Sequence, residues 1–142
     1  MVPAMDTLIL SLLGWINLNT EYDLRVDQPN IVMTEKANLC KQYGIDNRST
    51  CEATNLKAFY NRGVTIYLHE DFNPSDTQDQ ARLLHELVHY IQWHNDKNVG
   101  ACWGNLESEA YNLQDDWREE NSLHRHTDPF RLLMMEAACE DA

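Results

Sequence analysis

The chain has 142 residues, 43% of them hydrophobic, and a formal net charge of −12 at pH 7. This length and apolar content predict a single folded domain over residues 1–142 and exclude an intrinsically disordered chain. Acidic residues outnumber basic ones by 23 to 11, which argues against nucleic acid and anionic membranes as partners, because their phosphates would be repelled. No apolar run approaches the ~20 residues needed to span a bilayer.

The N-terminal part predicts a helix, a short strand and a second helix. Residues 5–16 predict an amphipathic first helix that begins at Asp6 or Thr7. This apolar stretch lacks the basic n-region and the small-residue cleavage site of a signal peptide. A short strand is expected over residues 29–33, and a helix over residues 35–43 that ends at Gly44.

The central part predicts a β-hairpin and then a long, buried helix. The hairpin strands are expected over residues 53–60 and 64–69, with Gly63 supplying the positive φ of the turn. The helix is expected to begin near Ser75 or Thr77, both at capping-box spacing, and to run to about Asn95. Its apolar residues cover much of its circumference, so it is expected to lie at the centre of the fold.

The C-terminal part predicts a loop over residues 95–104, a helix from Leu106 with apolar residues at helical spacing, an irregular segment over 121–129 and a last helix over 130–138. The tryptophans Trp93, Trp103 and Trp117 are expected in the core. Helices flanking a small sheet indicate an α+β fold.

The four cysteines are Cys40, Cys51, Cys102 and Cys139, and none forms a C-x-x-C pair. A cysteine-ligated structural zinc is therefore not expected. An even count fits two disulfides, and Cys40 and Cys51 bracket a polar loop that such a bond would close. A pairing of Cys51 with Cys102 stays open. Disulfides would indicate an oxidising compartment, such as the periplasm or the cell exterior.

The most informative motif is H-E-x-x-H, formed by His85, Glu86 and His89 in the long helix. Two histidines four residues apart lie on one face of a helix and can bind one Zn²⁺. Buried His and Glu side chains must also be paired or bind metal, because bare burial is costly. The motif predicts a peptidase in which Glu86 is the general base for a zinc-activated water.

A catalytic zinc needs a third protein ligand. The extended form H-E-x-x-H-x-x-G-x-x-H is excluded, because Gln92 and Asn95 stand where its Gly and third His would be. The next helix offers Glu107 and Glu109 instead. These two residues flank its apolar stripe about equally, so periodicity does not choose between them.

H-E-x-x-H followed on a later helix by E-x-x-[A/S]-D is the pattern of the gluzincin metallopeptidases, which this chain resembles. The resemblance implies a zincin-like fold, Glu107 as the third ligand and Ala110 as a small residue that lets the helices approach. The chain departs from the pattern at Tyr111, which stands in place of the Asp that supports a zinc ligand.

The chain also resembles a family of small, uncharacterised bacterial metallopeptidase-like domains over about residues 40–117. The shared segments are LHELVHYIQ at 84–92, Cys102 and ESEAYNLQ at 107–114, together with the strand residues 66–68. This resemblance implies a site and does not identify a substrate.

If the site is a peptidase centre, the strand over 64–68 is expected to be the edge strand that binds an extended peptide or protein substrate. An oxyanion donor is also needed, and the candidates are Tyr111, Arg118, His124 and His126. The segment 124–128 could hold a second metal but reads better as a polar surface turn.

Two rival interpretations keep the same helix. In one, the chain is a non-catalytic binding or structural domain in which zinc only holds two helices together. In the other, the chain binds no metal, and His85 and His89 are neutral and buried in a disulfide-secured fold.

Overall fold

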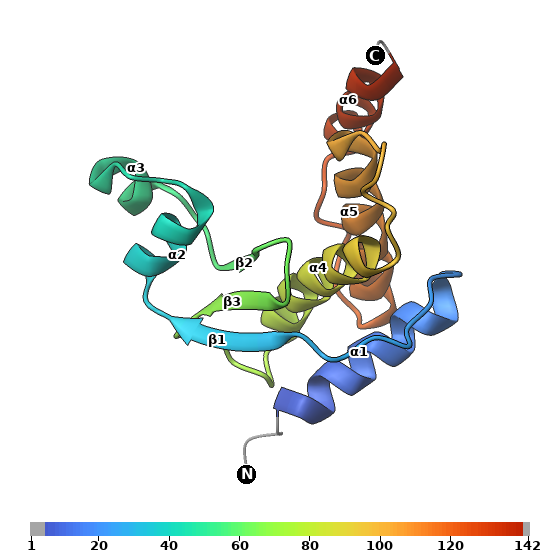
Figure 1. The fold of residues 1–142 in the computed structure, drawn as a ribbon, viewed down its shortest axis with the longest axis horizontal. Helices are drawn as coiled ribbons and strands as arrows, with labels where there is room; N and C mark the ends of the chain where they lie inside the picture. Colours follow the sequence, from blue (N-terminus) through green and yellow to red (C-terminus); the bar gives the residue numbers. More distant parts are fainter. Residues whose placement is uncertain (1–4, 141–142) are drawn as a thin grey trace.

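The computed structural model describes residues 5–140, which form six helices and a three-stranded sheet (Figure 1). The elements are α1 (Met5–Asn19), β1 (Asn30–Thr34), α2 (Lys36–Tyr43), α3 (Arg48–Ala53), β2 (Ala58–Tyr60), β3 (Thr65–His69), α4 (Thr77–His94), α5 (Trp103–Glu120) and α6 (Pro129–Glu140). The predicted α+β class is confirmed.

The sheet has the order β1-β3-β2, with β1 parallel and β2 antiparallel to β3. The strand expected at the edge, residues 64–68, is therefore the central one, and that prediction was wrong. β2 is the edge strand on the side of α4, and its Tyr60 is buried. The β2–β3 pair forms the predicted hairpin, but with a shorter first strand than expected.

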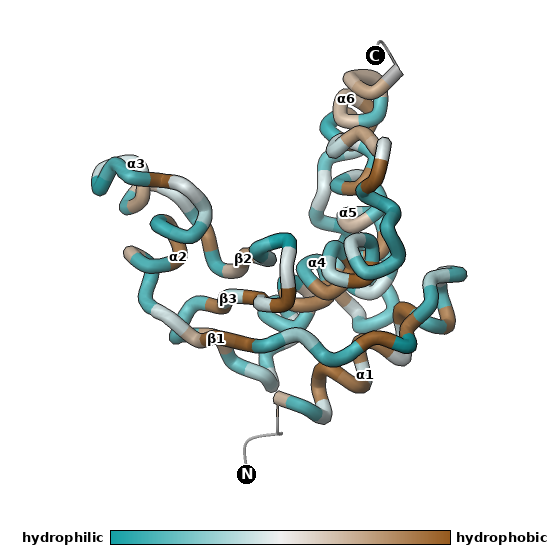
Figure 2. The backbone as a smooth tube through the Cα atoms, in the orientation of Figure 1, coloured by the Kyte–Doolittle hydropathy of each residue, from teal (hydrophilic) through white to brown (hydrophobic). Residues whose placement is uncertain are grey.

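Helix α4 is the centre of the core, as its two apolar faces predict. Leu83, Leu84, Leu87, Val88 and Ile91 are all fully buried in it. The helix packs against α1, the β2–β3 hairpin and α5. Figure 2 shows hydrophobic segments in α1, the strands and α4, whereas much of the α3 region is hydrophilic.

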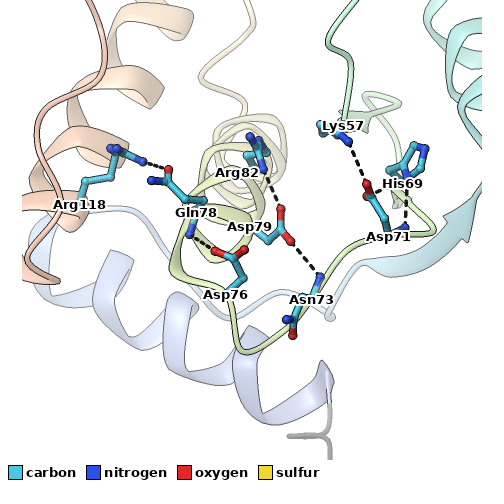
Figure 3. Close-up of polar contacts among 9 residues, drawn as sticks. All are labelled: Lys57, His69, Asp71, Asn73, Asp76, Gln78, Asp79, Arg82 and Arg118. Carbon is cyan, nitrogen blue, oxygen red and sulfur yellow. Dashed lines mark hydrogen bonds and ion pairs between the residues drawn. The ribbon is translucent and has the colours of Figure 1, made fainter.

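The start of α4 differs slightly from the expectation. Asp76, rather than Ser75 or Thr77, is the N-cap residue, and its carboxylate accepts a hydrogen bond from the Gln78 amide (Figure 3). The cap pairs one of the backbone N–H groups that the first turn of a helix leaves without a partner, close to one end of the candidate site.

Two disulfides fix the peripheral helices. Cys40–Cys51 is formed as predicted and joins α2 to α3, whereas Cys102 pairs with Cys139 and not with Cys51. The second bond joins the start of α5 to the end of α6. Gly104 lies at the same junction, where an added Cβ would come within 2.2 Å of a backbone carbonyl of α6.

Three local expectations were wrong. The residues after Asn47 form α3 rather than a loop, because the Asn47 side chain caps that helix. Arg62, not Gly63, has the positive φ of the hairpin turn, at 64°. Trp103 is 43% exposed rather than in the core, while Trp117 is buried as expected.

Within residues 5–140, no helix combines the length and the hydropathy required to cross a membrane.

Candidate metal centre

The candidate centre lies where α4 and α5 pack side by side in opposite directions. Gln78 of α4 contacts Arg118 of α5 at one end of this pair, and Trp93 contacts Trp103 at the other. Midway between these ends, His85 and His89 of α4 face Glu107 of α5. The spacing of the two histidines places both rings on the one face of α4 that meets α5.

Three donor atoms converge at this point. Glu107 Oε1 lies 2.8 Å from the Nε2 atoms of both His85 and His89, and the two Nε2 atoms are 3.2 Å apart. Both histidines are buried, while Glu107 is partly exposed. Within the described residues, these are the three side chains that can offer ligand atoms to one metal ion.

The Nδ1 atoms of both rings point away from the centre toward glutamine side chains. His89 Nδ1 lies 2.8 Å from Gln92 Oε1, and His85 Nδ1 lies 3.0 Å from Gln114 Oε1. Two hydrogen bonds fix the orientation of the Gln92 side-chain amide, because its Nε2 donates to the Leu106 carbonyl and to Glu109. His89 Nδ1 must therefore carry the proton that is donated to Gln92, and a neutral His89 presents a lone pair at Nε2.

The donor set fits a zinc ion. With the rings in this orientation, two imidazole lone pairs and one carboxylate oxygen face a common point, where they repel one another unless protons or a cation lie between them. Zn–N and Zn–O distances of about 2.0–2.1 Å place tetrahedral ligands about 3.3 Å apart, so the observed separations need to widen by only about half an ångström. Two nitrogens and one oxygen match the ligands of a catalytic zinc.

The charges of the cluster agree with this arrangement. Where no cation is bound, protons lie between these atoms: burial opposes ionisation of Glu107, but hydrogen bonds donated by the His85 and His89 rings outweigh it and lower the pKa of Glu107 to about 2. Burial also disfavours the charged form of His89, yet contact with Glu107 raises the pKa of that ring overall. Glu107 is therefore ionised at neutral pH and offers an anionic oxygen to a cation.

Glu109, the alternative to Glu107, does not face the cluster. Its Oε1 accepts hydrogen bonds from the Tyr22 hydroxyl and from Gln92 Nε2. Glu109 therefore holds the glutamine that orients His89, one step removed from the converging atoms.

Glu86 lies beside the cluster, on the face of α4 that is turned toward β2. It is partly exposed and lines the same cleft as the two histidines. Burial raises the pKa of the Glu86 carboxyl, and positive charge on His85 and His89 opposes that rise. A carboxylate with a raised pKa, placed in this way, can act as a proton acceptor beside the cluster.

The cluster opens into a cleft of about 940 Å³. The cleft is bordered by β2 and the end of α2 on one side and by α5, the following loop and the start of α6 on the other. Figure 1 shows α2 and α3 at one end of the molecule and α5 and α6 at the other, with α4 between them. A volume of this size is typical of a ligand site.

Two aromatic side chains flank the histidines within the cleft. The Tyr111 ring lies 4.5 Å from the His85 ring, and the Trp103 ring stacks on His89 at 4.9 Å. Of the other oxyanion candidates, Arg118 and His126 line the cleft, whereas His124 contributes a backbone carbonyl that accepts from Arg118.

Sequence reasoning missed the roles of Gln92, Gln114 and Trp103. A usable signal existed for Gln92, because an amide on an otherwise apolar and central helix must find partners. Gln92 is fully buried and follows His89 by three residues, on the same face of α4. Trp103 gave no such signal, since a lone tryptophan at a helix start is ordinarily a core residue.

The chain matches a family described as a domain of unknown function, DUF6647, over residues 2–142. The chain belongs to this family. No curated protein and no solved structure is significantly similar to it. Membership in DUF6647 assigns no activity, so the function has to be argued from the centre itself.

Proposed function

We propose that this DUF6647 domain is a zinc-dependent peptidase with a minimal zincin-like fold. The observation that supports this most directly is the convergence of two Nε2 atoms and one carboxylate oxygen at the bottom of an open cleft, with Glu86 beside them. His85, His89 and Glu107 would hold the ion, which leaves a position open toward the cleft.

A bound zinc ion would supply Lewis-acid chemistry, polarising the carbonyl of the substrate and lowering the pKa of a water molecule. Glu86 then accepts a proton from the attacking water and passes it to the leaving amine. Gln92 and Gln114 hold the two Nδ1 atoms and keep both Nε2 atoms turned toward Glu107, where the ion would be held. Glu109 and Tyr22 support Gln92 in turn.

The edge strand β2 supports peptide binding. Strand β3 pairs with one edge of β2, which leaves the other edge of β2 without a strand partner among residues 5–140, and residues 56–60 line the cleft. An extended peptide laid along β2 would gain main-chain hydrogen bonds with little dependence on side chains. Such a peptide would pass over Glu86, because β2 packs on α4 at that face.

Tyr111 is the best-placed oxyanion donor among the candidates. Its ring is in contact with His85 and lines the cleft. Burial raises the pKa of its hydroxyl, so the hydroxyl stays protonated and can donate a hydrogen bond. The support that an Asp at this position would give to a zinc ligand comes instead from Gln114, whose Oε1 lies 3.0 Å from His85 Nδ1.

The two disulfides support function in an oxidising compartment, such as the periplasm or the cell exterior. The periphery of this fold, α2–α3 and α5–α6, is where both bonds lie.

The test is hydrolysis of quenched fluorescent peptide pools by the zinc-loaded chain, compared with a Glu86→Gln variant. The wild-type chain is expected to cleave, and the variant is expected to bind one zinc per chain and lose cleavage by a factor of about 10² or more. Equal cleavage by both proteins would contradict the proposal. Zinc bound one per chain with no cleavage of any pool would favour the non-catalytic, zinc-stabilised domain.

A further inference from the structure

The lining of the cleft holds more basic than acidic side chains, unlike the rest of the chain. Five of the 11 lysines and arginines line the cleft, against three of the 23 acidic residues. Two of those acids, Glu86 and Glu107, belong to the candidate centre itself. The basic residues are Lys57, Arg62, Arg82, Arg118 and Arg131. Although the chain has a net charge of −12, nearly half of its basic side chains thus lie where a substrate would bind.

Two of these cations already have carboxylate partners. Lys57 pairs with Asp71 at 2.9 Å, and Arg82 pairs with Asp79 at 2.7 Å (Figure 3). Their charge is therefore largely compensated by the protein.

The other three arginines have no carboxylate partner among the side chains of residues 5–139. Arg118 is only 7% exposed, and its guanidinium donates to the side-chain oxygen of Gln78 (Figure 3). It also donates to the backbone carbonyl of His124, which is equally neutral. A buried cation with only neutral partners favours an anion nearby. Arg62 and Arg131 are exposed at the cleft.

Arg62 lies on the His89 side of the centre. Its guanidinium lies over the rings of Trp103 and Trp93, at 5.0 and 5.5 Å from their centroids, and Trp103 stacks on His89. The residue has a φ of 64°, a left-handed conformation that costs energy for any residue except glycine. The hairpin turn thus keeps an arginine in a place where Asn or Gly would be the less strained choice.

Arg131 has the corresponding position on the His85 side. Its guanidinium lies 5.3 Å from the centroid of the Tyr111 ring, and that ring contacts His85. Each histidine is therefore covered by one aromatic ring, and each ring is covered by one arginine. Neither guanidinium forms an ion pair with a carboxylate in the described side chains, so each can bind an anionic group of a ligand.

We infer that the cleft selects peptides with carboxylate groups on both sides of the bond at the centre. Arg62 binds the carboxylate on the His89 side, and Arg131 binds the one on the His85 side. Arg118 adds a fixed positive charge at the Gln78 end of the cleft. This selectivity rests on the proposed function. The acidic exterior repels such peptides at long range, so the preference depends on contacts inside the cleft, within a Debye length of about 10 Å.

The experiment measures binding, not turnover, on the zinc-loaded Glu86→Gln chain. Fluorescein-labelled peptides of one length are compared by anisotropy: one with Glu on both sides of a central dipeptide, and one with Gln at the same positions. The Glu peptide is expected to bind about tenfold more tightly. Arg62→Gln and Arg131→Gln should each weaken its binding about fivefold and leave the Gln peptide within about twofold.

Matched controls define the outcome. Arg48→Gln removes an exposed arginine of α3 that does not line the cleft, and should change neither affinity. Arg62→Lys should retain part of the preference, because charge remains without the planar fork. Far-UV circular dichroism and zinc content verify that each variant is folded and loaded.

A second peptide pair, with a free or an amidated C-terminus, identifies the source of the carboxylate. Loss of affinity on amidation assigns the recognition to a terminal carboxylate, and loss on Glu-to-Gln exchange assigns it to side chains. Loss on Glu-to-Gln exchange supports the inference, whereas loss on amidation alone would overturn it, because one terminal carboxylate lies on only one side of the bond. Equal binding of the Glu and Gln peptides, or arginine variants that weaken both alike, would overturn it. Preference for the Glu peptide without cleavage by the wild-type chain would refute the peptidase and leave the recognition intact.

Discussion

Replacing Gln92 with methionine tests whether the zinc ligands are oriented in advance. Gln92 is fully buried, accepts the Nδ1 proton of His89, and donates to the Leu106 carbonyl and to Glu109. Methionine has nearly the same volume and shape but makes none of these three hydrogen bonds. The change therefore removes polar contacts without opening a cavity.

The expected loss follows from those contacts. Each net hydrogen bond is worth about 1 kcal/mol, and a buried His89 Nδ1–H left without an acceptor costs about 1–3 kcal/mol more. Glu109 keeps its bond from Tyr22, which limits the damage on that side. We expect Gln92→Met to lower the free energy of unfolding by about 3–5 kcal/mol and to weaken zinc binding by about 10- to 100-fold.

The assay is competition for zinc against a chromophoric chelator, with urea unfolding measured in parallel. Gln114→Met, which removes one bond to His85 from a partly exposed residue, should weaken zinc binding less than Gln92→Met does. Gln42→Met on the exposed face of α2 should change neither quantity. If Gln92→Met lost stability while its zinc affinity stayed within about twofold of wild type, the claim that Gln92 orients His89 would be refuted.

Three further changes probe the ligand choice and the frame around the centre. Glu107→Gln should weaken zinc binding by at least about 100-fold, whereas Glu109→Gln should stay within about threefold, because an amide oxygen can accept both of its hydrogen bonds; equal losses in chelator competition would contradict this. Gly104→Ala should cost about 1–3 kcal/mol in urea unfolding through its clash with a carbonyl of α6, and an unchanged midpoint would argue against close packing there. Joint replacement of Cys102 and Cys139 by serine should lower stability by about 4 kcal/mol, because their bond spans 37 residues. A loss below about 1 kcal/mol would show that the α5–α6 junction does not depend on the bond.

Much of the centre could be anticipated because it depends on local geometry. The spacing of His85 and His89 places both rings on one helix face whatever surrounds them, and the apolar run around them predicts a buried helix. The prediction of a Cys40–Cys51 disulfide was equally local, because the two cysteines bracket one loop, and this disulfide is formed.

The rest depends on contacts between distant segments. Glu107 and Glu109 flank their helix stripe alike, and the structure separates them through Tyr22, 87 residues away in the chain. The position of β2 at the sheet edge follows from β1 pairing with the other side of β3, which no local pattern encodes. The positive φ of the hairpin turn was predicted at Gly63 but lies at Arg62. Glycine was the expected residue because it adopts a positive φ at the lowest free-energy cost.

The central claim is that one zinc ion binds between α4 and α5 through two imidazoles and one carboxylate. Anomalous diffraction above and below the zinc absorption edge, on crystals of the zinc-loaded chain, tests it most directly. The account predicts a single strong peak about 2.0–2.1 Å from His85 Nε2, His89 Nε2 and a Glu107 oxygen. A peak elsewhere, or density in which the two imidazoles and Glu107 stay in direct contact at full zinc loading, would contradict it.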